Sequence, residues 1–158
     1  MSDLVSPQGG SMHAHSPQVH RTLLRASPDT PRQARQVVRI WSALGLGLKS
    51  DLLEDVVLVV SELVTNSVKH AHFIPGREWV QLSIDTDPAS IRVTVTDPGH
   101  PSEYPQRPWA DSRKLSGLTM GGRGLQIVDH ICNGVWNTSL TESHERMVQA
   151  RIPIDPHT

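Results

Sequence analysis

Glycines and an arginine lead directly into an apolar helical pattern in the stretch GGRGLQIVD, residues 121–129. Glycine costs up to about 1 kcal/mol per helical position relative to alanine, so this turn needs a bare backbone for another purpose. A glycine-rich turn that enters a helix leaves N–H groups free at the positive end of the helix dipole, where phosphate binds. A loop that needs positive φ explains the glycines equally well.

A polar stripe follows the longest periodic segment of the chain, residues 50–72, which predicts a core helix capped by Ser50 or Asp51. The predicted inner face consists of Leu53, Val56, Val60, Leu63, Ser67 and Ala71. Residues three, four and seven apart stack on one side of a helix, so Glu62, Asn66 and Lys69 lie together, nearly opposite the inner face. An ordinary solvated face is the alternative interpretation. The apolar pair Leu58 and Val59 flanks the stripe and indicates that something covers it.

Asp97 continues the alternation of Ile91, Val93 and Val95, so its side chain is predicted to point to the same inner face. A buried carboxylate is costly unless a protein donor or a ligand amino group satisfies it. A turn aspartate at the end of a strand is the alternative, because DPG is also ordinary turn chemistry. Taken together, Asn66 could ligate Mg²⁺ through its oxygen, Asp97 could accept from an adenine amino group, and the glycines could hold phosphates.

The elements that position these residues are predicted from periodicity and from turn and cap residues. They are a leader at 1–17, a strand within 18–27, a helix within 27–46, the helix at 50–72, a hairpin of strands 78–85 and 90–97, a proline-rich loop at 98–120, a helix at 122–132, and strands at 135–141 and 147–154. The first helix is predicted to bury Ala34, Val37, Val38, Trp41 and Leu44. This order predicts an α+β protein, a mixed or antiparallel sheet with helices on one face.

Composition narrows the class of protein further. The formal charge of −1 does not favour direct binding to nucleic acid or to an anionic membrane. The single cysteine, Cys132, lies in an apolar helical run and is interpreted as a packing residue. We expect a cytoplasmic protein, because no apolar run approaches the length of a membrane helix and the N-terminus lacks a signal pattern.

The three motifs together resemble the ATP-binding module of the GHKL superfamily. ELVTNSVKHA (62–71) resembles the N box, DPGHP (97–101) the first glycine box, and GGRGL (121–125) the second. The resemblance implies a Bergerat-type two-layer sandwich in one domain, 18–155, with an ATP lid at about 98–121. The length and the N-box wording are most similar to bacterial anti-sigma factor serine/threonine kinases.

The resemblance also implies roles for single residues. Glu62 is the candidate general base, Asn66 the Mg²⁺ ligand, and Asp97 the adenine-reading carboxylate beside Gly99. The candidate phosphate-loop and further nucleotide contacts are Lys69, His70, Gly122, Arg123, Gly124 and Leu125. The implied cofactors are ATP or ADP and Mg²⁺.

The implied partners are a sigma factor and an anti-anti-sigma protein of the STAS type. The sequence leaves open whether the chain forms a homodimer. Relatives often carry a threonine near adenine in the last strand, and Met147 is expected at that place. The lid also carries four prolines and Trp109. Two alternatives to a kinase remain: a binding module without catalysis, and an ATPase or regulator unconnected with sigma factors.

Overall fold

The computed structural model describes residues 18–101 and 123–154. The predicted leader at 1–17, most of the predicted lid and Gly122 lie outside the described residues.

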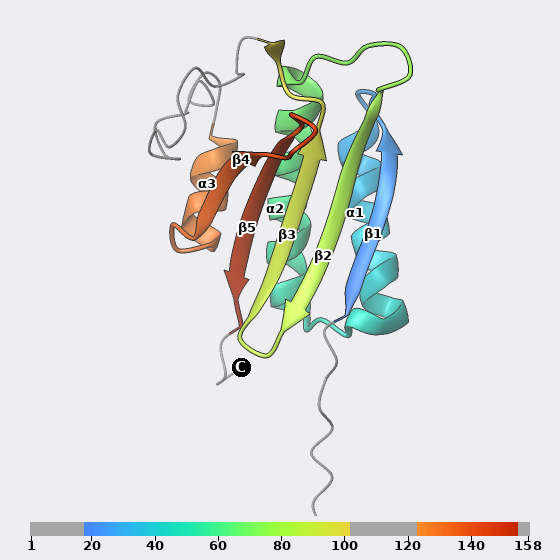
Figure 1. The fold of residues 1–158 in the computed structure, drawn as a ribbon. Helices are drawn as coiled ribbons and strands as arrows, with labels where there is room; N and C mark the ends of the chain where they lie inside the picture. The colour runs from blue at the N-terminus through green and yellow to red at the C-terminus, as the bar shows by residue number, and fades with distance from the viewer. Residues whose placement is uncertain (1–17, 102–122, 155–158) are drawn as a thin grey trace, which may run out of the picture.

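A five-stranded antiparallel sheet forms one layer of the fold, with strand order β1-β2-β3-β5-β4. Its strands are β1 (Val19–Arg25), β2 (Trp79–Asp87), β3 (Ser90–Asp97), β4 (Trp136–Leu140) and β5 (Arg146–Pro153). Figure 1 shows β1 and β4 at the two edges, with β3 in the centre. The predicted α+β class is confirmed, and all pairings within the described sheet are antiparallel.

The second layer consists of helices on one face of this sheet (Figure 1). They are α1 (Thr30–Trp41), the π-helical turn η1 (Ser42–Leu46), α2 (Ser50–His70) and α3 (Gly124–Ile131). The α2 helix packs against α1 on one side and against α3 on the other, and it lies over β3. This central place makes α2 the element that relates the parts of the candidate site to one another.

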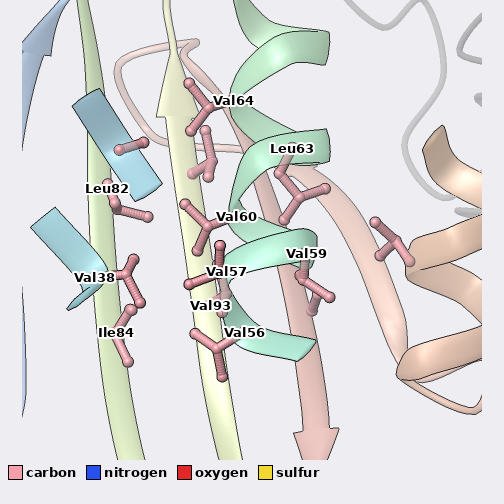
Figure 2. Packing of buried hydrophobic residues seen from close by; sticks show 14 of the residues in the cluster. Val38, Val56, Val57, Val59, Val60, Leu63, Val64, Leu82, Ile84 and Val93 are labelled. Atoms are coloured by element: carbon pink, nitrogen blue, oxygen red, sulfur yellow. The ribbon is translucent and has the colours of Figure 1, made fainter. Parts of the chain in front are cut away.

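Valines of α2 make up much of the core between the two layers. Figure 2 shows Val56, Val60 and Val64 pointing toward the strands, whereas Val59 and Leu63 point to the side where α3 lies. All five side chains are at most 1% exposed. Each buried side chain of this size contributes about 1.5–3 kcal/mol relative to an exposed one. The predicted inner face is therefore confirmed at its centre.

Two details differ from the sequence-based expectation. The N-cap of α2 is Lys49, so Ser50 is already helical and Asp51 lies in the first turn, where its charge complements the helix dipole. Leu44 is 79% exposed rather than buried. The wide π turn, in which Gly47 N donates to Ser42 O at 3.0 Å, shifts Leu44 out of the α-helical phase.

Candidate functional site

The predicted site residues come from three elements that meet at one end of the molecule. The C-terminal ends of α2 and β3 lie together there, with the N-terminal end of α3 beside them (Figure 1). A backbone hydrogen bond ties two of these segments, because His72 N donates to Gly99 O at 2.7 Å. The fold therefore gathers the residues that the sequence analysis singled out on α2, after β3 and before α3.

Glu62 and Gly124 are in direct contact across α2 and α3. A Cβ atom at position 124 would overlap Glu62 Oε2 and lie 3.3 Å from Glu62 Cδ. The Glu62 carboxylate thus lies at the first residue of α3, where the helix dipole favours negative charge. The glycine that the sequence analysis associated with phosphate is also the residue that leaves room for the candidate base.

Asn66 lies one turn further along α2 and is half-buried. Its Nδ2 atom is buried and has no hydrogen-bond partner among the described residues. A buried polar group without a partner costs about 1–3 kcal/mol. A ligand with an acceptor atom would remove this cost, so the amide is suited to contact a bound group.

Asp97 points inward as predicted and is 2% exposed. Of the two donors that the sequence analysis left open, the structure provides a protein donor. Arg146 Nη2 and Nε lie 2.7 and 3.2 Å from Asp97 Oδ2, and Gly99 N donates to Asp97 Oδ1 at 2.8 Å. Arg146 is itself 3% exposed, so the two charges form a buried ion pair.

Arg146 is the residue that sequence reasoning missed. Met147 was expected beside the adenine position, but it pairs with Thr96 and is only half-buried, whereas Arg146 pairs with Asp97. A shift of one residue along a strand moves a side chain to the other face of the sheet. The alternation of the buried residues Val148, Ala150 and Ile152 was the signal that places Arg146 on the inner face.

Gly99 follows Asp97 in a backbone conformation that favours glycine, with φ at +73°. A Cβ at this position would lie 3.6 Å from Arg146 N and 3.7 Å from His144 O, which are ordinary contacts. The backbone angle, rather than crowding, is therefore what requires glycine here.

The remaining predicted contacts lie around this group. Lys69 and Arg123 are exposed and His70 is half-buried. Arg123 is the N-cap residue of α3, and its carbonyl accepts from Ile127 N at 3.0 Å. Leu125 packs against the core, so its side chain has a structural role at this position.

The apolar pair that flanks the polar stripe divides between core and surface. Val59 is fully buried and belongs to the core cluster, so the protein itself covers it. Leu58 is 40% exposed. The prediction that something covers this side of the helix therefore holds at Val59, where the core of the protein itself is the cover.

Cys132 is buried in the core behind α3, as its apolar surroundings predicted. Burial, together with the nearby Asp129 carboxylate, raises the pKa of the Cys132 thiol to about 11. The thiol is therefore protonated at neutral pH and is poorly suited to act as a nucleophile.

A hollow of about 400 Å³ lies elsewhere, over β3, β4 and β5. Its side chains include Arg92, Asn137, Gln149 and Arg151. Arg92 already forms an ion pair with Asp85 at 3.2 Å. None of the predicted site residues lines this hollow, so it is not part of the candidate site.

No group of three or more His, Cys, Asp or Glu side chains within residues 18–101 and 123–154 is arranged to hold a metal ion. A Mg²⁺ ion at Asn66 would accordingly take few ligands from the described protein. Mg²⁺ commonly keeps several waters and binds through one or two protein oxygens plus substrate phosphates. One amide oxygen near a carboxylate is consistent with that pattern.

In the described parts of the chain, no helix is both long and apolar enough to cross a bilayer.

Comparison with known proteins yields a family and a group of relatives. Residues 24–152 match the family described as histidine kinase-like ATPase domain. The serine-protein kinase RsbW of Bacillus velezensis is 27% identical over 95 residues, which cover 57% of this chain and 59% of the relative. RsbW of Staphylococcus epidermidis is 28% identical over 95 residues, covering 56% and 60%. The chain thus spans about three fifths of the length of the curated relatives that it matches.

Among solved structures, the fold is similar to a chain in the crystal structure of the SiaB-SiaC complex from Pseudomonas aeruginosa. The TM-score is 0.60 at 15% sequence identity, and the match covers 84% of this chain and 88% of that chain. At this identity the likeness concerns the fold.

Proposed function

The chain belongs to the family of histidine kinase-like ATPase domains, and we propose that it is an Mg-ATP-dependent protein kinase that phosphorylates a serine or threonine of a partner protein. The family implies ATP binding. The choice of protein phosphorylation over other ATP chemistry is supported by the similarity to serine-protein kinases named RsbW.

The observation that carries this proposal is the contact between Glu62 and Gly124. It puts a carboxylate beside the backbone that would hold the phosphates. In the proposed step, Glu62 takes the proton of the partner hydroxyl while the hydroxyl oxygen forms a bond to the γ-phosphorus. The bond from that phosphorus to the β-γ bridging oxygen breaks, and ADP leaves. Positioning and charge neutralisation supply most of the rate in such transfers.

Asn66 is the proposed Mg²⁺ ligand, through its side-chain oxygen. Its buried Nδ2, which has no partner among the described residues, would donate to a phosphate oxygen. The metal, when bound, would neutralise charge that develops on the phosphates. A single amide can serve both roles because its oxygen accepts and its nitrogen donates.

The adenine ring and the phosphates of the nucleotide are proposed to bind at the two glycine boxes. Asp97 would accept from the adenine amino group, and Gly99 would let the backbone turn beneath the base. The proposed phosphate and nucleotide contacts are Lys69, His70, Gly122, Arg123, Gly124 and Leu125. The positions of Arg123 and Gly124 at the start of α3 support this assignment, since a helix N-terminus favours anions.

The proposed partner is an anti-anti-sigma protein of the STAS type, and binding of a sigma factor would connect the kinase to transcription. The proposal also includes a cytoplasmic location and a homodimer. A binding module without catalysis is the second candidate, favoured by one observation. The carboxylate assigned to adenine is already bound to Arg146.

Transfer of labelled phosphate tests the kinase against the binding module. The chain is incubated with ATP labelled at the γ-position, Mg²⁺ and STAS-type proteins from the same genome. We expect one of them to become labelled on serine or threonine, and labelling to stop when Mg²⁺ is chelated. A chain that binds Mg-ATP but labels none of them would support the binding module.

A further inference from the structure

The acceptor capacity of Asp97 is largely used within the protein. A carboxylate offers about four lone-pair directions. Oδ2 receives two N–H groups from Arg146, and Oδ1 receives the Gly99 N–H. About three of these four directions are therefore already taken within the protein.

The ion pair is also closed to the outside. The side chains of Arg146 and Asp97 are 4% and 1% exposed. An adenine ring cannot contact a carboxylate that is 1% exposed unless a neighbouring group moves. The Arg146 guanidinium is the group that holds Oδ2, so its movement would expose the acceptor that an amino group needs.

Arg146 can make this movement without a change in the sheet. It is the first residue of β5 and directly follows the turn in which Thr141 N donates to Glu145 O at 2.9 Å. Its Cα is fixed by pairing with Asp97, whereas the long side chain has several rotatable bonds. Separation of a buried ion pair is costly unless both charges find new partners. An adenine amino group would supply one for Asp97, and solvent or phosphate would supply one for Arg146.

We propose that the Asp97–Arg146 ion pair closes the adenine site, so that an adenine nucleotide binds only when the Arg146 side chain leaves Asp97. This inference rests on the proposed function, because it takes Asp97 as the residue that reads adenine. Arg146 thereby sets the affinity of the site: every binding event carries the cost of opening the pair. Arg146 is not a catalytic residue.

Calorimetric titration of Mg-ATP into wild type and Arg146→Thr tests this directly. The shorter neutral side chain cannot occupy both acceptor directions of Oδ2, so we expect ATP to bind at least tenfold more tightly than to wild type. Arg151→Thr is the matched control. It makes the same change on the same strand at an exposed position, and its affinity should equal that of wild type.

Arg146→Thr leaves the buried Asp97 charge without its main partner, so thermal unfolding must show that the variant is folded. If it is not, Arg146→Gln replaces it, because the amide still donates to Asp97 but carries no charge. A second measurement uses wild type. The Arg146 Nε–H resonance, assigned by its loss in Arg146→Lys, should shift and exchange faster with water when Mg-ATP is added.

The outcomes separate this inference from the proposed function. If wild type and the folded Arg146 variant both bind ATP and the variant binds it no more tightly, or if the Nε–H resonance stays unchanged at saturating ATP, the gating role of Arg146 is overturned while the nucleotide site stands. If wild type and the folded variant both fail to bind ATP, the nucleotide site itself is overturned, and this inference with it.

Discussion

The carboxylate of Glu62 lies against the α-carbon of Gly124, so closely that a single added methyl group would overlap Oε2. This contact joins the middle of α2 to the first residue of α3. It explains why residue 124 is a glycine, because any side chain there would occupy the space of the Glu62 carboxylate beside the helix N-terminus. Changes at either residue should therefore affect function before they affect folding.

Gly124→Ala should separate stability from function. Alanine is favoured over glycine in a helix by about 1 kcal/mol, and the overlapping atom is the end of a flexible side chain. We expect an unchanged or slightly higher melting temperature and at least a tenfold loss of phosphotransfer, because Glu62 is displaced. Gly45→Ala is the control, since its Cβ would meet only Gln18 Oε1, at 3.5 Å. Full phosphotransfer by Gly124→Ala would mean that the position of Glu62 does not matter.

Glu62→Gln should keep ATP binding and lose transfer. The amide fills the same space but cannot accept the hydroxyl proton. General-base catalysis contributes roughly 10²–10⁴-fold, and we expect a loss of that order in single-turnover labelling, with unchanged affinity for Mg-ATP in calorimetry. Equal transfer rates in the variant and in wild type would remove Glu62 from the mechanism.

Asn66→Ala should abolish Mg-ATP binding without destabilising the fold. The substitution removes a buried donor that has no partner among the described residues, so stability should stay the same or rise by about 1–3 kcal/mol. Urea denaturation and calorimetry measure the two effects. Asp55→Ala, at an exposed position of the same helix, should change neither. Unaltered Mg-ATP affinity in folded Asn66→Ala would refute the assignment of Asn66.

Cys132 should react slowly with thiol reagents. Its pKa is raised to about 11 from 9.0, because burial favours the neutral thiol, so the folded chain keeps this proton as the pH rises through 9. At pH 8 roughly a hundredfold less thiolate is present than at an unshifted thiol. Maleimide labelling of the folded chain should be slower by at least that factor than labelling in denaturant. Rapid labelling of folded protein would show that the thiol is accessible and ionised.

Much of the fold could be predicted from periodicity. The hairpin of β2 and β3 alternates clearly, and α2 has a continuous apolar face, so both elements and the inward direction of Asp97 followed from spacing. Leu44 was assigned wrongly because helical spacing was extended across η1, where the turn is wider. Val59 was expected to be covered but was left out of the predicted inner face, since one helix alone does not show that α3 packs on that side.

The candidate site was harder to predict than the fold. Motif order brought together residues of α2, β3 and α3, but the contact between Glu62 and Gly124 depends on how two helices pack. Arg146 was missed because charged residues are normally exposed, and only the register of β5 against β3 places it beside Asp97. Long-range strand register of this kind is not visible in local spacing.

Calorimetric titration of the wild-type chain with Mg-ATP, with ADP as comparison, is the decisive experiment for the nucleotide site. We expect saturable binding of one nucleotide per chain, and weaker binding when Mg²⁺ is chelated. The absence of saturable heat for either nucleotide at millimolar concentration, with wild type and a folded Arg146→Thr variant alike, would contradict it.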